Sequence, residues 1–146
     1  MIQRIQSLYL LLAAAAGAAT WFFDIWKAVL GDNTVTYFNA QSSYLIFVLY
    51  MLIVALALVC IFLFKNRKLQ FRLTVLNIFL SIGAIVLQYF KVLDFANALQ
   101  TSGKTITTSS YQPAAFLPIL ILVFLFLAAR GIYKDERLIK SLDRLR

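Results

Sequence analysis

The stretch YLIFVLYMLIVALALVCIFLF, residues 44–64, decides the class of this protein, because it contains 21 residues without a charged side chain. As a helix rising about 1.5 Å per residue, such a segment measures roughly 30 Å, the thickness of the hydrocarbon core of a bilayer. Backbone amide and carbonyl groups in lipid must be hydrogen-bonded within the protein. The stretch is therefore predicted to be a transmembrane helix.

The composition of the whole chain predicts the same class. Of its 146 residues, 62% are hydrophobic and 14% are charged, whereas soluble domains contain roughly 45–50% apolar and about 25% charged residues. Three more apolar stretches accompany the first. We predict an all-α integral membrane bundle, a single domain over residues 1–146, with spans at about 5–23, 44–64, 73–90 and 113–129 and a tail at 130–146.

The first apolar stretch has a second interpretation, a cleaved signal peptide, because one arginine precedes an apolar run rich in small residues. The aromatic residues that follow are typical of a belt at the membrane interface and favour a retained span. They are Trp21, Phe22, Phe23 and Trp26. Cleavage would leave three helices in the same orientation.

Lysine and arginine are distributed unevenly between the spans. Eleven lie in the N-terminal segment, the turn 65–72 and the tail, and three lie in the segments 24–43 and 91–112. Cytoplasmic segments of membrane proteins are enriched in these residues. The pattern predicts a multi-pass protein with both termini and the turn in the cytoplasm. The segments 24–43 and 91–112 are predicted to be outer loops, the second ending in the polar, aperiodic TSGKTITTSS.

The tail is predicted to be an amphipathic helix, with Leu138, Ile139, Leu142 and Leu145 on one face and Gly131 as a swivel outside the membrane. It could lie on the inner leaflet or dock on a protein partner. Nucleic acid is not an expected partner, since no nucleic-acid-binding motif is present. The residues predicted to contact anionic lipid head groups or a partner are Lys65, Arg67, Lys68, Arg72, Arg137, Lys140 and Arg144.

The third span carries a stripe of uncharged polar residues: Thr74, Asn77, Ser81 and Gln88. Their spacings of 3, 4 and 7 place them on one face of a helix. Amide side chains in hydrocarbon need polar partners, so this face is predicted to contact protein. It could serve as interhelical packing or as a polar groove.

Small residues at four-residue spacing mark the first span, with Ala13 and Gly17 as the leading pair. Such residues let two helix backbones approach closely. They predict a close helix contact, either within the chain or with another subunit.

The residue inventory excludes several kinds of chemistry. The chain has no histidine, hence no imidazole ligand or imidazole base, and its one cysteine, Cys60, cannot form an intrachain disulfide. No cofactor or metal is expected. Asp24 and Asp94, at the outer edges of two spans, could form a catalytic pair or could be two solvated carboxylates.

Three segments together resemble a known family: MIQRIQSLYLLLA at 1–13, KNRKLQFRLTVLN at 65–77 and ARGIYKDERLIKSLDRLR at 129–146. The family comprises small four-helix inner-membrane proteins of Gram-negative bacteria and is known as a domain of unknown function. The resemblance implies four spans and an inner-membrane location. It implies no activity and no catalytic residues.

These observations favour a non-catalytic protein, an accessory or scaffolding subunit of an inner-membrane complex. Its partners would be the bilayer, anionic head groups and either another membrane protein or a second copy. The alternative is a small transporter or lipid-handling protein that uses the polar face of the third helix. A membrane enzyme built on Asp24 and Asp94 is the third hypothesis.

Overall fold

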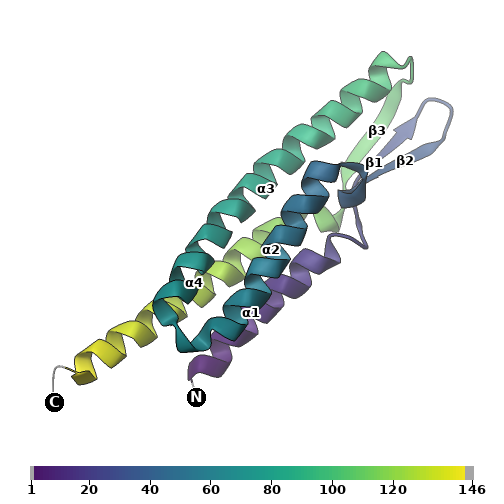
Figure 1. The fold of residues 1–146 in the computed structure, drawn as a ribbon. Coiled ribbons are helices and arrows are strands. Elements are labelled where there is room, and N and C mark those ends of the chain that lie inside the picture. The colour runs from purple at the N-terminus through teal and green to yellow at the C-terminus, as the bar shows by residue number, and fades with distance from the viewer. Residues whose placement is uncertain (1, 144–146) are drawn as a thin grey trace.

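The structure is a computed structural model that describes residues 2–143. Four helices form an elongated bundle, and three strands form a small sheet at one end of it (Figure 1). The elements, in chain order, are α1 (Ile2–Ala19), β1 (Asp24–Leu30), β2 (Val35–Asn39), α2 (Tyr44–Phe62), α3 (Arg67–Thr101), β3 (Ile106–Tyr111) and α4 (Leu117–Asp143). Short 3-10 turns stand before α2, before α3 and before α4, at 40–42, 63–65 and 113–116.

Successive helices run in opposite directions. Both ends of the described chain lie at the same end of the bundle as the turn between α2 and α3, and the sheet lies at the opposite end (Figure 1). We call these the termini end and the sheet end. In the bundle α1 packs against α4 and α2, and α3 packs against α4 and α2. The alternation agrees with the predicted order of the spans.

Three helical segments are long and apolar enough to cross a membrane: Tyr44–Lys65, Arg67–Thr101 and Pro113–Ile139. The helical, membrane-type part of the predicted fold is confirmed at this level. The apolar part of α1, Ile5–Ala19, is shorter. The predicted helical end at Phe23 is wrong, since α1 ends at Ala19 and the chain then turns into a strand. Helix α3, in contrast, is longer than its predicted span. It has 35 residues, and at about 1.5 Å per residue it extends well beyond a bilayer core of roughly 30 Å.

Local signals place the boundaries of α3. The side chain of Asn66 accepts a hydrogen bond from the backbone N–H of Leu69, which caps the start of the helix. Gly103 follows its end with φ of +80°, a conformation that glycine adopts without a steric penalty. The helix therefore stops where the polar segment begins.

The prediction of an all-α fold is wrong because both supposed outer loops contain strands. They form one antiparallel sheet in the order β2-β1-β3, in which Lys27 of β1 lies between Tyr37 of β2 and Ser110 of β3. The segment 101–110, predicted to be an aperiodic loop, includes most of β3. Sequence pattern missed this strand because its pairing partner lies some 80 positions earlier in the chain, and because its side chains are mostly exposed and polar.

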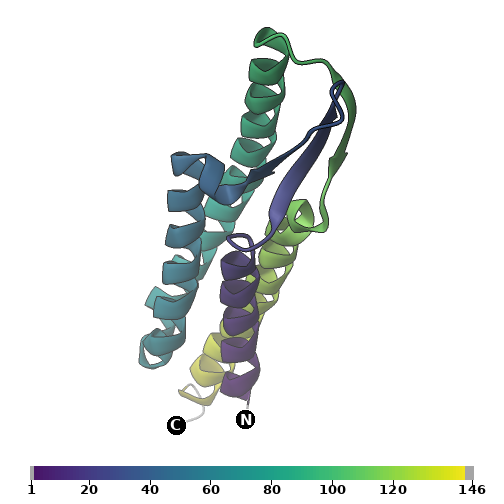
Figure 2. The same ribbon diagram turned by 90° about the vertical axis from the view of Figure 1, so that its right-hand side faces the viewer.

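Aromatic contacts hold the sheet against the upper part of α3, which stands beside it in Figure 2. The ring of Phe95 on α3 meets Trp26 edge-on at 6.1 Å between centroids and Phe38 at 5.2 Å. Trp26 is only 4% exposed, so its predicted place in an interfacial belt is wrong. Phe22 and Phe23 are 82% and 60% exposed and remain available to an interface.

Candidate functional site

The four predicted polar residues of α3 all lie inside the bundle. Thr74, Asn77 and Ser81 are at most 1% exposed and Gln88 is 6% exposed. Ala84 and Gln70 complete the buried face of the helix. We call the row Gln70–Thr74–Asn77–Ser81–Gln88 the polar seam.

Three side chains of the polar seam hydrogen-bond to other segments. Asn77 Nδ2 donates to the carbonyl of Ile53 at 3.1 Å, and Gln70 Nε2 donates to that of Cys60 at 3.0 Å, both on α2. Gln88 accepts from Tyr50 Oη at 2.7 Å and donates to the carbonyl of Ala115, before α4, at 3.2 Å. Because these partners come from two segments, the polar seam joins α3 to both.

The two hydroxyls of the polar seam bond within α3 itself. Thr74 Oγ1 donates to the carbonyl of Gln70 and Ser81 Oγ to that of Asn77, each at 2.8 Å. Thr74 Oγ1 also lies 3.8 Å from the sulfur of the buried Cys60. The carbonyl oxygen Oδ1 of Asn77 is buried with no hydrogen-bond partner in the part of the chain that the structure describes.

Sequence reasoning missed Gln70, although its signal was present. It lies four residues before Thr74 and seven before Asn77, and so continues the same helical face toward the termini end.

The small residues of α1 lie at its contacts with other helices of the same chain. Ala13 is fully buried. A Cβ atom added to Gly17 would lie 2.6 Å from Cγ2 of Val54 on α2 and 3.7 Å from Cδ1 of Ile121 on α4. Glycine at this position therefore permits the close approach of α1 to α2.

A buried carboxylate organises the termini end, and sequence reasoning missed it. Asp135 on α4 is 5% exposed. Its Oδ2 accepts a hydrogen bond from Gln6 Nε2 of α1 at 2.6 Å and lies 3.6 Å from a guanidinium nitrogen of Arg67, at the start of α3. The signal was its position three residues after Ile132 and seven after Ala128, on the buried face of α4. The three residues form what we call the Asp135 junction.

The tail is not a separate element joined by a swivel, contrary to the prediction for Gly131. Helix α4 runs unbroken from Leu117 to Asp143. A Cβ atom at Gly131 would lie 2.9 Å from Cγ of Gln6, so this glycine accommodates the α1 side chain that reaches Asp135. The predicted apolar face of the tail includes Leu138 and Ile139, which are 47% and 41% exposed.

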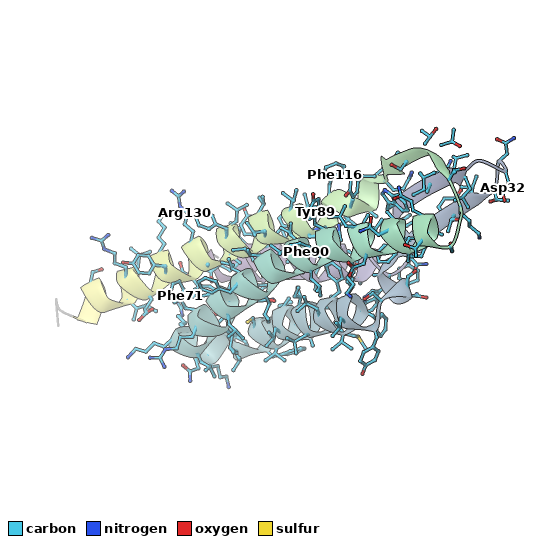
Figure 3. All side chains as sticks on the ribbon, turned by 90° about the horizontal axis from the view of Figure 1, so that it is seen from above. Asp32, Phe71, Tyr89, Phe90, Phe116 and Arg130 are labelled. Carbon is cyan, nitrogen blue, oxygen red and sulfur yellow. The ribbon has the colours of Figure 1, made fainter. Side chains whose placement is uncertain are left out.

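The turn and the tail, which carry most of the basic residues, are in contact. Besides the contact of Arg67 with Asp135, the rings of Phe71 on α3 and Tyr133 on α4 lie 6.0 Å apart. Arg130 points away from the bundle (Figure 3). The exposed basic side chains of this region are Lys65, Lys68, Arg72, Arg130, Lys134 and Arg137. The side chain of Lys140, all of Arg144, and the apolar-face residues Leu142 (its side chain) and Leu145 lie outside what the structure describes.

The two carboxylates of the predicted catalytic pair, Asp24 and Asp94, have different surroundings. Asp94 is exposed and pairs with Lys91 of its own helix at 3.3 Å. Asp24, at the start of β1, lines a hollow to which Asp94 does not contribute. Within residues 2–143, apart from side chains of uncertain placement, no group of three His, Cys, Asp or Glu residues is arranged to hold a metal ion.

A protein-family model matches almost the whole chain. The family model described as "Domain of unknown function (DUF4293)" covers residues 2–145, so the chain belongs to this family. The resemblance of the segments 1–13, 65–77 and 129–146 to a domain of unknown function is confirmed to this extent. No curated protein matches the chain.

Proposed function

We propose that this member of the DUF4293 family is a non-catalytic docking subunit of a complex in the bacterial inner membrane. Its termini end would face the cytoplasm and bind anionic head groups together with a second membrane protein. The observation that carries this proposal is the attachment of the tail to the α2–α3 turn by the Asp135 junction and by the Phe71–Tyr133 contact. These contacts bring the two basic segments together at the termini end, where both would contribute to one docking surface.

The charge of this surface supports a negatively charged binding partner. Six exposed basic side chains lie on the turn and the tail, whereas Asp135 is buried and already paired and Glu136 is only partly exposed. Each basic residue near an anionic leaflet contributes about 1 kcal/mol of attraction. The same excess of basic residues supports the cytoplasmic orientation.

Exposed apolar side chains on the same stretch of α4 support a contact with lipid or protein in addition to charge. Tyr133, Leu138 and Ile139 are 57%, 47% and 41% exposed. They stand among Lys134 and Arg137, so the described part of the tail offers both apolar and basic groups. Helices of this composition bind at membrane surfaces or in the grooves of partner proteins.

A small transporter is the alternative function, and the unpartnered Oδ1 of Asn77 is the observation that supports it. A transport path requires polar groups that a solute can reach. The amide nitrogens of Gln70, Asn77 and Gln88 are instead engaged by carbonyl groups of neighbouring segments. The docking function therefore accounts for more of the structure.

Recovery of partners from native membranes tests the proposal. The full-length chain is cross-linked in cells, extracted in mild detergent and analysed by mass spectrometry. The test variant is Lys134→Gln/Arg137→Gln, and the matched control is Lys27→Gln/Lys104→Gln, which removes two charges from the sheet end. Truncation after Ala129 is unsuitable, because it would also remove the buried residues Ile132 and Asp135.

We expect a specific membrane protein to be recovered with the wild type and the control, and its yield to fall severalfold with the test variant. A wild-type chain that is recovered alone, as a monomer without cross-linked protein, would contradict the proposal. Equal recovery of the partner with both variants would contradict the assigned surface.

A further inference from the structure

A hollow of about 410 Å³ opens at the sheet end, where the chain passes from α1 into β1 and from β3 into α4. Its lining combines four apolar residues with one carboxylate and one carboxamide: Phe23, Pro113, Ala114 and Leu117 with Asp24 and Gln112. An apolar wall with a few polar groups is the usual composition of a ligand-binding site.

The carboxylate of Asp24 is available to a ligand. In the described part of the chain no hydrogen bond or ion pair engages it, in contrast to Asp94, which pairs with Lys91. Gln112 uses its amide nitrogen in a long contact of 3.5 Å with Ser110 Oγ. Its carbonyl oxygen adds an acceptor to the two oxygens of Asp24, so the hollow offers three acceptors for a cation.

The surroundings of the hollow indicate its depth in a bilayer. Phe22, Phe23 and Phe116 are 82%, 60% and 61% exposed, and Phe116 lies just before α4, toward its sheet-end terminus (Figure 3). The apolar run of α4 begins directly beyond them. Tyrosine side chains at the end of a span mark the level of the lipid head groups, and at this end Tyr44, at the start of α2, and Tyr111, at the end of β3, are 78% and 47% exposed.

We propose that this hollow binds the primary ammonium head group of an aminophospholipid, phosphatidylethanolamine, from the leaflet at the sheet end. Asp24 and the Gln112 carbonyl accept hydrogen bonds from the ammonium group, and the lipid chains run along Leu117 and Phe116 beside α4. Charge and hydrogen-bonding capacity together exclude the competing head groups. The net negative head group of phosphatidylglycerol lacks a cation, and the quaternary ammonium of phosphatidylcholine has no N–H group to donate.

This site goes beyond the proposed docking function and does not depend on it, because the hollow lies at the opposite end from the basic surface. Lipid retention measured by native mass spectrometry tests it. The full-length protein is reconstituted with equal parts of the three phospholipids, extracted in mild detergent and then titrated with each lipid. The test variant is Asp24→Asn and the matched control is Asp94→Asn, which removes the same charge at the same end.

We expect phosphatidylethanolamine to be retained preferentially by the wild type and by Asp94→Asn. Loss of a charge-assisted hydrogen bond should weaken its binding to Asp24→Asn about tenfold. Retention of phosphatidylcholine or phosphatidylglycerol as strongly as phosphatidylethanolamine would overturn the proposal, and so would unchanged binding in a folded Asp24→Asn.

A second variant keeps the test informative if Asp24→Asn fails to fold. Leu117→Trp enlarges a partly exposed side chain of the wall and leaves the carboxylate in place. It should fill the hollow and abolish the preference for phosphatidylethanolamine. An undiminished preference in this variant would show that the lipid binds elsewhere and would overturn the proposed site.

Discussion

The two ends of the molecule differ in charge and in the interactions that join their helices and strands. The segments 1–4, 65–72 and 130–146 carry eleven basic and three acidic residues, whereas 24–43 and 91–112 carry three of each. At the termini end three helices meet through the polar contacts of Asp135. At the sheet end the strands meet α3 through Phe95 and its aromatic neighbours.

This difference indicates that the ends can fail separately. The sheet end depends on buried apolar area, which is lost when an aromatic side chain is truncated. The termini end depends on a buried carboxylate, whose partners are left unpaired when it is removed. The polar seam between them contributes hydrogen bonds, and the net stabilisation from such bonds inside a membrane is small. Substitutions in each region can test this ranking.

The largest effect should come from Phe95→Ala at the sheet end. Removing a large buried aromatic side chain costs about 3–5 kcal/mol, and the partial burial of Phe95 places this change near the lower limit. We expect faster proteolysis within 24–43 and 102–112 while the helical content measured by circular dichroism is kept. Phe79→Ala, on the same helix at a position 69% exposed, is the control and should leave the proteolysis pattern unchanged.

Asp135→Ala should have the next largest effect, confined to the termini end. Gln6 and Arg67 would lose a shared acceptor, at a cost of about 2 kcal/mol. Hydrogen exchange should accelerate in residues 131–143, whereas Lys134→Ala, an exposed neighbour, should not change it. In the double variant with Phe95→Ala the two destabilisations should add within about 0.5 kcal/mol. A double variant whose change in unfolding free energy departs strongly from the sum would show that the two ends are coupled. The conclusion that they fail separately would then be wrong.

Asn77→Leu in the polar seam should have a smaller effect. The change removes the bond to the Ile53 carbonyl, and interhelical hydrogen bonds in membrane proteins average about 0.6 kcal/mol. It also removes the unpartnered Oδ1, which offsets part of that loss. Unfolding in detergent mixtures should give a change below about 1 kcal/mol. A loss of several kcal/mol would mean that Oδ1 has a partner in the membrane, such as a bound water or another chain.

The smallest effect concerns pH and the β1–β2 turn. Hydrogen bonds from the Thr34 hydroxyl and backbone lower the pKa of Asp32 below its ordinary value of 3.8. The pKa of Asp32 is lower in the folded protein than in the unfolded chain. The contribution of its carboxylate to the stability of the turn is therefore complete above the ordinary pKa, and it is lost as the pH falls through the folded pKa. Exchange of the turn amides should therefore accelerate slightly below about pH 4. Asp32→Asn should remove that dependence, and a persistent slope in this variant would assign it to another group.

The helices were predictable because their signals are local. Long apolar runs identified α2 and α4, and the spacing of Thr74, Asn77, Ser81 and Gln88 identified the buried face of α3. The burial of Asp135 was readable from its spacing to Ile132, but its partners were not, since Gln6 lies 129 positions away. The hollow at Asp24 could not be predicted from the sequence either, because its lining comes from two segments about 90 positions apart.

The sequence by itself determined that this chain forms apolar helices, where their apolar runs lie and which segments carry the basic residues. These properties depend on composition and on periodicity over a few turns, and both can be read along the chain. The tertiary structure decided that residues 24–39 and 106–111 form one sheet, that α4 continues into the tail, and which groups face Asp24 and Asp135. The physical reason is that strand pairing and buried polar contacts join residues distant in sequence, and their stability depends on a geometry that only the folded bundle supplies.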